Sequence, residues 1–150
     1  DFELPGTRDA KVKLSDQLRN GPVLLLFYPL DWSPVCTNEF CSLRDGFKEF
    51  EGCGVTVLGI SVDSIFSHKA FAEKLKISFQ LLSDFNKEVC KAYNVIHEEI
   101  FGLKGIAKRS AFLITRDGGI RYRWVADDPG IMPNLDEIKG KIASIGRKTE

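Results

Sequence analysis

One cysteine of this 150-residue chain occupies a position that suits redox chemistry. Cys36 follows Ser33 and Pro34, which favour a helix start, since serine caps well and proline fits the first helical position. A thiol there meets unpaired backbone N–H groups and the positive end of the helix dipole, and both favour the thiolate. Because the thiolate is the nucleophilic form of cysteine, the spacing predicts a reactive thiol at Cys36.

Free cysteines are often just small buried apolar residues, and this is the alternative for Cys36. The arrangement Pro29-x-x-x-Ser33-x-x-Cys36 favours the chemical interpretation. A second cysteine, Cys41, follows five residues later and could compete for an oxidised product. The first helix therefore carries two candidate redox residues.

The elements expected around Cys36 would place it at the end of a buried strand. Residues 23–28 are an unbroken apolar run, typical of a strand buried on both faces, and Pro29 ends it because proline cannot donate to a sheet ladder. The helix after Ser33 has one apolar face, made by Cys36, Phe40, Leu43, Phe47 and Phe50. The Cys36 thiol is thus expected at the N-terminal end of the apolar face of this helix.

The rest of the chain predicts strands and helices in alternation. Residues 55–62 read as a second central strand, and a helix is expected after Ser67. Residues 111–114 and 120–125 flank Arg-Asp-Gly-Gly, a strong hairpin signal, and an apolar stripe over 135–145 predicts a last helix. The fold class expected is α/β, with a central mixed sheet flanked by helices.

The motif Pro29-x-x-x-Ser33-x-x-Cys36 resembles the active-site signature of the peroxiredoxins. Further segments resemble that family in order, and they cover nearly the whole chain: Asp1-Phe2-Glu3-Leu4-Pro5, Gly59-Ile60-Ser61-Val62-Asp63, Leu81-Leu82-Ser83-Asp84 and Arg109-Ser110-Ala111-Phe112-Leu113-Ile114. The resemblance implies a single thioredoxin-like domain over residues 1–150. It also implies an enzyme that reduces hydrogen peroxide and organic hydroperoxides through a cysteine.

The resemblance assigns a role to each residue of the motif. Cys36 would be the peroxidatic cysteine, which attacks a peroxide oxygen and becomes a sulfenic acid. Ser33 would hydrogen-bond peroxide and thiolate, and Pro29 would shield the thiolate from water. Arg109 would be the family's buried arginine, lowering the thiol pKa, with Glu39 orienting it. The alternatives are a solvated strand end for Arg109, within a basic patch, and an ordinary exposed helix position for Glu39.

The spacing Cys36-x4-Cys41, followed by Leu-Arg-Asp, resembles the Q-type peroxiredoxins, also called bacterioferritin-comigratory proteins. In many of these a cysteine on the same helix resolves the sulfenic acid, which would make Cys41 the resolving residue. Five residues of helix separate two Cα atoms by roughly 8.6 Å, whereas a disulfide needs about 4.4–6.8 Å. The first turns would therefore unwind after oxidation. Cys90 is expected to be structural, and Cys53 lies in a probable turn.

Composition fits this interpretation. Acidic and basic residues balance at 21 each, so nothing indicates nucleic acid or a membrane surface as a partner. With no apolar run of spanning length and no signal peptide at its start, the chain is expected in the reducing cytoplasm. Expected partners are a hydroperoxide and a thioredoxin-like or glutaredoxin-like reductant, without cofactor or metal. The chain would be a monomer or a small homo-oligomer such as a dimer.

Other classes of function have weaker support. A thioredoxin-type disulfide exchanger would carry Cys-x-x-Cys, which is absent from the sequence. A metal module could use Cys36, Cys41, His68 and His97, but none of these pairs has zinc-finger spacing, and both histidines are expected at the surface. A non-catalytic thioredoxin-fold holdase would leave Ser33 and Arg109 without a role. Within the peroxidases, the alternative is a one-cysteine mechanism in which an external thiol resolves the sulfenic acid.

Overall fold

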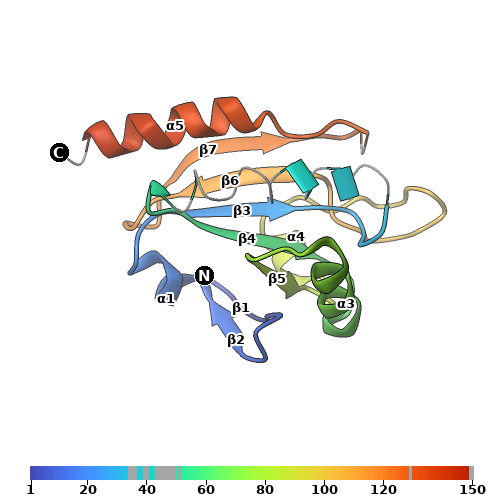
Figure 1. The fold of residues 1–150 in the computed structure, drawn as a ribbon. Coiled ribbons are helices and arrows are strands. Elements are labelled where there is room, and N and C mark those ends of the chain that lie inside the picture. The colour runs from blue at the N-terminus through green and yellow to red at the C-terminus, as the bar shows by residue number, and fades with distance from the viewer. Residues whose placement is uncertain (34–36, 39–40, 43–49, 51, 129, 149–150) are drawn as a thin grey trace.

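The computed structural model describes residues 1–33, 37–38, 41–42, 50, 52–128 and 130–148 (Figure 1). The strands are β1 (Glu3–Pro5), β2 (Lys11–Lys13), β3 (Val23–Phe27), β4 (Thr56–Ser61), β5 (Gln80–Ser83), β6 (Ser110–Ile114) and β7 (Ile120–Val125). The helices are α1 (Leu14–Leu18), α3 (Ile65–Leu75), α4 (Glu88–Ala92) and α5 (Leu135–Lys148).

The main sheet is mixed and has β3 at its centre. Its strand order is β5-β4-β3-β6-β7, with β3, β4 and β5 parallel and with β6 antiparallel to both β3 and β7. Every residue of β3 is buried, as expected for an apolar strand covered on both faces. A separate hairpin joins β1 to β2.

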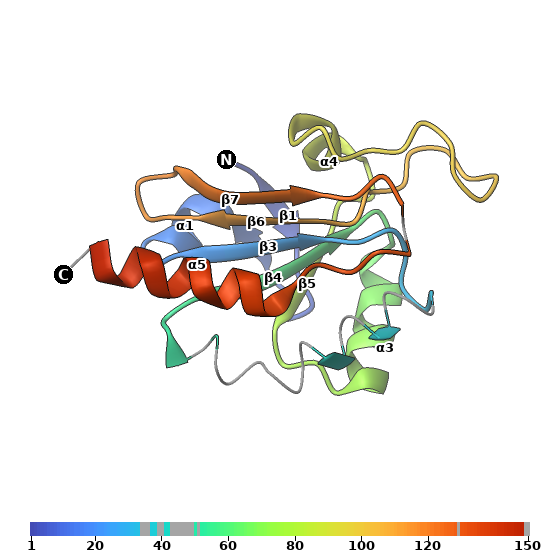
Figure 2. The same ribbon diagram turned by 90° about the horizontal axis from the view of Figure 1, so that it is seen from above.

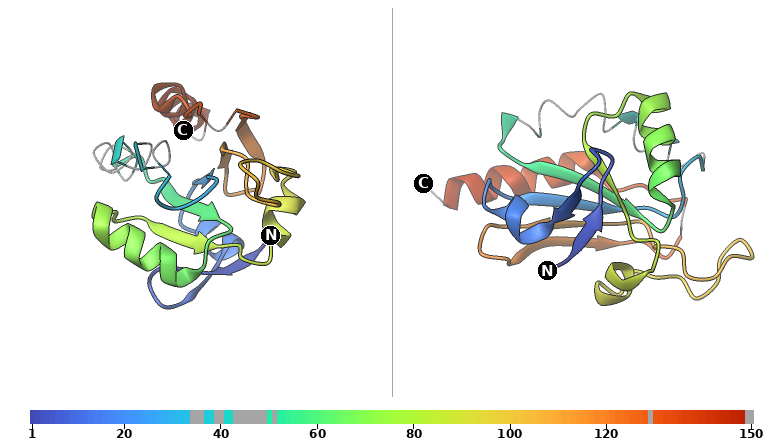
Figure 3. Two further views of the ribbon diagram at one scale, coloured as in Figure 1. Left: turned by 90° about the vertical axis from the view of Figure 1, so that its right-hand side faces the viewer. Right: turned by 90° about the horizontal axis from the view of Figure 1, so that it is seen from below.

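Alternate side chains of β3 enter two cores, one on each face of the sheet. Leu25 packs with residues of the β1–β2 hairpin, α1 and α4, whereas Leu24 and Leu26 pack with Phe71 of α3 and Ile138 of α5. Figures 2 and 3 show α5 lying along one face, with α1, α4 and the β1–β2 hairpin on the other. The expected mixed sheet flanked by helices is confirmed.

The predicted strands are confirmed, as is the hairpin of β6 and β7. The start of the third helix was predicted wrongly: α3 begins at Ile65, because the Ser64 side chain caps it by accepting a hydrogen bond from the Ser67 N–H. The predicted amphipathic helix from Cys36 to Phe50 lies mostly outside the described residues. Within that span, residues 37–38 and 41–42 are helical, as is Phe50.

The candidate functional residues share one edge of the sheet. Because β3, β4 and β5 are parallel, their carboxyl ends meet at that edge, and β6 begins there with Ser110 opposite Phe27. The loop after β3 and the residue before β6 are thereby brought together. In parallel sheets, this is the edge where ligand sites usually form.

Candidate active site

The loop that follows β3 is well anchored at its start. The Tyr28 N–H donates to the Ile60 carbonyl over 3.0 Å, so β3 and β4 stay in contact one residue beyond the strand. Tyr28, Pro29 and Asp31 are all buried. A buried proline here agrees with the shielding role expected for Pro29, since the ring adds apolar surface and has no N–H to satisfy.

Trp32 gives this loop an unfavourable backbone conformation. Its φ of 73° lies in the left-handed region, which costs a residue other than glycine of the order of 1–3 kcal/mol. Its side chain is 52% exposed and meets Phe71 of α3 edge to face, with ring centroids 5.1 Å apart. The loop keeps this shape only because surrounding contacts outweigh the strain.

Ser33 lies where a helix begins. Its carbonyl accepts a hydrogen bond from the Thr37 N–H at 2.9 Å, the first i to i+4 bond of a helix. Its hydroxyl donates to the Leu30 carbonyl at 3.2 Å, so the loop itself fixes the orientation of the hydroxyl. This bond agrees with the predicted helix start at Ser33, although residues 34–36 lie outside the described residues.

Of the other candidate site residues on the predicted helix, Cys41 lies among the described residues. Cys41 is helical, half-buried and a free thiol, whereas Cys36 and Glu39 lie outside the described residues. Among the remaining cysteines, Cys53 is exposed and Cys90 is buried. The expectation that Cys90 is structural agrees with its burial.

Arg109 is almost completely buried, with 1% of its surface exposed. It immediately precedes β6, and its carbonyl accepts from the Ala126 N–H at 2.9 Å. Since Ser110 pairs with Phe27, the register places Arg109 beside Tyr28, at the start of the loop after β3. The alternative of a solvated strand end is wrong, and the buried guanidinium fits the predicted role as a fixed positive charge.

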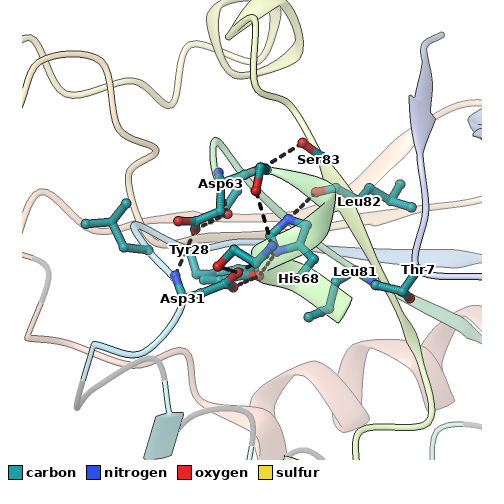
Figure 4. A network of polar contacts seen from close by, with 12 residues as sticks. Thr7, Tyr28, Asp31, Asp63, His68, Leu81, Leu82 and Ser83 are labelled. Carbon is teal, nitrogen blue, oxygen red and sulfur yellow. Dashed lines mark hydrogen bonds and ion pairs between the residues drawn. The ribbon is translucent and has the colours of Figure 1, made fainter. Parts of the chain in front are cut away.

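A second group of polar residues meets the same loop, and we call it the Asp31 network: Tyr28, Asp31, Asp63, Ser67 and His68 (Figure 4). Asp31 Oδ1 accepts from the Tyr28 hydroxyl at 2.6 Å. Asp31 Oδ2 accepts from the Ser67 hydroxyl at 2.8 Å and lies 2.8 Å from His68 Nδ1. The Asp31 N–H donates to Asp63 Oδ2 at 2.8 Å. Both the carboxylate and the main chain of Asp31 are thus engaged.

The expectation that His68 and His97 lie at the surface is wrong, because both are buried. His68 sits on the inward face of α3, where its ring bridges Asp31 and the carbonyl of Leu82, 2.9 Å from Nε2. The sequence offered a signal: His68, Phe71 and Leu75 recur at steps of three and four, the spacing of one helix face. Asp31 and Asp63 also lay within the segments that resemble peroxiredoxins, but sequence reasoning gave them no role.

Burial perturbs the titration of this network. The pKa of Tyr28 is raised well above its ordinary value by burial and then by the Asp31 carboxylate, so its hydroxyl stays protonated and donates. The pKa of Asp63 is also raised, chiefly by burial, although the Ser61 hydroxyl that donates to Asp63 Oδ2 at 2.6 Å opposes the shift. The site therefore keeps Tyr28 as a donor and disfavours a charge on Asp63.

Asp31, Asp63 and His68 could in principle hold a metal ion, since one atom of each lies within 4.8 Å of the others. Each of those residues already makes short protein contacts. Asp63 Oδ2 accepts two hydrogen bonds, and Asp31 Oδ2 faces both the Ser67 hydroxyl and His68 Nδ1. The carboxylate oxygens already accept hydrogen bonds from hydroxyl and backbone donors of the protein, so we interpret this group as a hydrogen-bonded network.

Fold and site together define a class of protein. A thioredoxin-like mixed sheet carries Pro29 and Ser33 in the loop after its central strand, with a buried arginine beside the start of that loop and the cysteine of the motif following in sequence. This arrangement is that of a cysteine-dependent peroxidase.

Comparison with known proteins identifies the family. Residues 1–123 match the model of the AhpC/TSA family, and the chain belongs to it. It is 41% identical over 126 residues to a peroxiredoxin named bcp from Coxiella burnetii, covering 82% of each chain. It is 37% identical over 148 residues to the chloroplastic 2-Cys peroxiredoxin BAS1 of Spinacia oleracea, covering 91% of this chain but only 54% of that relative.

Solved structures agree with the sequence relatives. The crystal structure of peroxidoxin BcpB from Mycobacterium tuberculosis superimposes with a TM-score of 0.85 at 31% identity, covering 96% of this chain and 92% of that one. The chain is thus a peroxiredoxin of the bacterioferritin-comigratory type and a thiol-dependent peroxidase. Enzymes of this class act on peroxides and are recycled by thioredoxin-type reductants. In the part of the chain that the structure describes, no helix has the length and apolar character needed to cross a membrane.

Proposed function

We propose that Cys36 is the peroxidatic cysteine of this enzyme and that Cys41 resolves its oxidised form. The observation that supports this most is the buried Arg109 beside the loop that leads to Cys36. A guanidinium excluded from water stabilises a nearby thiolate more strongly than an exposed one, because the effective dielectric constant is lower. Ser33, with its hydroxyl fixed by the loop, and the buried Pro29 lie on the same loop.

The first step oxidises Cys36. Its thiolate attacks one peroxide oxygen, so that an S–O bond forms while the O–O bond breaks and the sulfur becomes a sulfenic acid. The second oxygen takes the electron pair of the broken bond and leaves as water or an alcohol once protonated. The positive charge of Arg109 stabilises the negative charge that develops on the oxygens, and a hydrogen bond from the Ser33 hydroxyl does the same. Glu39 orients the guanidinium in this scheme.

The second step converts the sulfenic acid of Cys36 into a disulfide, which a reductant can then cleave. The Cys41 thiol attacks the sulfenic sulfur, an S–S bond forms, and the S–O bond breaks with loss of water. In a continuous helix the two Cα atoms would be roughly 8.6 Å apart, beyond the reach of a disulfide, so the segment between them unwinds first. A thioredoxin-like or glutaredoxin-like dithiol then supplies two electrons and returns both thiols. The one-cysteine alternative replaces Cys41 with an external thiol.

The test is intact mass with thiol-blocking peptide mapping after one equivalent of hydrogen peroxide. Wild type should lose two hydrogens, mapped to a Cys36–Cys41 disulfide, and Cys41→Ser should accumulate sulfenic acid on Cys36. Cys53→Ser is the matched control, since Cys53 is exposed but lies outside the motif. Sulfenic acid accumulating in wild type would favour the one-cysteine mechanism, and an unreactive Cys36 would contradict the assignment.

We also propose that residues 1–150 act as one domain in the reducing cytoplasm. Support comes from the free thiols of Cys41, Cys53 and Cys90, which such a compartment preserves. The assembly proposed is a monomer or a dimer, and Trp32 and Phe101, 52% and 70% exposed, are apolar surface that a second copy could cover. Fractionation of the source cells tests the compartment, and light scattering of the purified protein tests the assembly.

A further inference from the structure

The loop that presents Ser33 depends on side-chain contacts for its shape. Trp32 holds a left-handed backbone conformation, which lowers the stability of the loop in isolation. The Ser33 hydroxyl is aimed by the Leu30 carbonyl, so it moves if the loop moves. A residue that fixes this loop therefore fixes part of the reaction site.

Asp31 is the point where the loop is fixed. Its main chain is tied to the bend after β4 through the Asp63 carboxylate, and its side chain is tied to α3 through the Ser67 hydroxyl and the His68 ring. The side chain is completely buried, so water competes little for these contacts. Tyr28, at the other end of the loop, donates to the same carboxylate.

His68 extends this anchor to a third strand. While Nδ1 lies 2.8 Å from Asp31 Oδ2, Nε2 lies 2.9 Å from the carbonyl of Leu82 in β5. Figure 4 shows the ring between the loop and β5. The imidazole, wholly buried, thus connects the loop to a strand whose position the sheet already fixes.

We propose that His68 and Asp31 are positioning residues for peroxide reduction, which hold the loop Pro29–Ser33 in the geometry that the reaction at Cys36 needs. The proposal rests on the proposed function, because it takes from it the roles of Ser33 and Cys36. In this proposal both residues act through the loop and take no part in the bonds that form and break. Misplacing a reacting or orienting group by about 1 Å can lower a rate about 100-fold, so a rigid anchor outside the pocket has a measurable effect.

Two substitutions at His68 separate positioning from mere stability. The amide nitrogen of asparagine can occupy the place of Nδ1, and that of glutamine the place of Nε2. His68→Asn thus keeps the contact with Asp31 and loses that with Leu82, whereas His68→Gln does the reverse. Asp84→Asn is the matched control, since Asp84 is a buried carboxylate whose two oxygens accept the Val89 and Cys90 N–H groups of α4, away from the Asp31 network.

Two rates are measured on each variant at a temperature where circular dichroism shows it folded. One is the second-order rate of Cys36 oxidation by hydrogen peroxide, followed by stopped-flow fluorescence. The other is alkylation of Cys36 by iodoacetamide between pH 5 and 9, followed by peptide mass. We expect His68→Gln to lose about 10- to 100-fold in the oxidation rate and to shift the alkylation profile to higher pH. His68→Asn should stay within about threefold of wild type, and Asp84→Asn should match wild type.

Equal rates for the two His68 variants, or an equal loss in Asp84→Asn, would overturn the proposal. If His68→Gln does not fold, Ser67→Ala tests the positioning role in its place, because it removes one hydrogen-bond donor to the same Asp31 oxygen. We expect it to lower the oxidation rate about 3- to 10-fold, and a wild-type rate would overturn the proposal. If wild type itself does not react with peroxide, the proposed function fails, whereas the alkylation comparison still tests positioning.

Discussion

The two carboxyl groups of the Asp31 network, of which Asp31 is buried and Asp63 half-buried, should respond differently to replacement by asparagine. Asp31 uses both oxygens, which face the Tyr28 hydroxyl on one side and Ser67 and His68 on the other. An asparagine has a single acceptor oxygen, so its amide group would face a donor on one of the two sides. Asp63 instead accepts both of its side-chain hydrogen bonds on Oδ2, so an asparagine oxygen can replace it.

The expected magnitudes follow from these contacts. A hydrogen bond to a charged group contributes about 1.5–3 kcal/mol to stability and a neutral one about 0.5–1.5 kcal/mol, so each contact weakens by about 1 kcal/mol when the carboxylate becomes an amide. The three side-chain contacts of Asp31 together would lose about 3 kcal/mol. We therefore expect Asp31→Asn to lower the free energy of unfolding by about 3 kcal/mol. For a domain of this size, each kcal/mol lowers Tm by about 2–4 °C.

Asp63→Asn should change the free energy of unfolding by about 1 kcal/mol or less at pH 7. The raised pKa of Asp63 means that its surroundings favour the neutral carboxyl group over the carboxylate, and asparagine is neutral and of similar shape. The sign with pH follows. A group whose folded pKa exceeds its ordinary value of 3.8 contributes stability below that pH and loses it as the pH rises through the folded pKa. The stability of Asp63→Asn relative to wild type should therefore rise as the pH increases from 4 to 7.

Urea unfolding at 25 °C, followed by circular dichroism in the presence of a thiol reductant, measures both variants. The midpoint should fall strongly for Asp31→Asn and little for Asp63→Asn, with unchanged slopes. Repeating the Asp63→Asn series at pH 4, 5.5 and 7 tests the predicted sign. Equal losses in the two variants at pH 7, or a relative stability of Asp63→Asn that falls with pH, would refute the reasoning.

Two further predictions concern charge and thiols. Arg109→Met should lower the second-order rate of Cys36 oxidation about 10²–10³-fold, because it removes the buried positive charge. Arg109→Lys should lie between Arg109→Met and wild type, since lysine keeps the charge but not the planar fork of the guanidinium. Stopped-flow fluorescence measures the rate, and an unchanged rate for Arg109→Met would contradict the role of the guanidinium. Burial raises the pKa of the Cys90 thiol, and the Asp84 carboxylate adds to this shift. In the folded protein at pH 8, iodoacetamide should therefore label the exposed Cys53 at least about 100-fold faster than Cys90. In urea the two should react alike, and peptide mapping of the native sample that finds Cys90 labelled as fast as Cys53 would show the prediction to be wrong.

Local sequence signals identified the elements that carry strong periodicity or punctuation. The run at 23–28, ended by Pro29, predicted β3, and Arg-Asp-Gly-Gly predicted the hairpin of β6 and β7. The apolar stripe over 135–145 predicted α5, and the Asn134 side chain caps the start of that helix by accepting the Glu137 N–H at 3.1 Å. The start of α3 was missed because two serines were available as caps, and the apolar pattern alone did not distinguish Ser64 from Ser67.

The sequence by itself determined the chemistry: a cysteine near a helix start, preceded by serine and proline, in segments that resemble peroxiredoxins in order. These signals are local, since capping and helix starts depend on residues a few positions apart. Only the tertiary structure decided the surroundings of that chemistry. Arg109 is buried because the register of β6 against β3 places it beside Tyr28, and His68 meets Asp31 across 37 residues of sequence. Partners of polar side chains are set by the pairing of distant strands and helices, which the spacing of residues along the chain does not specify.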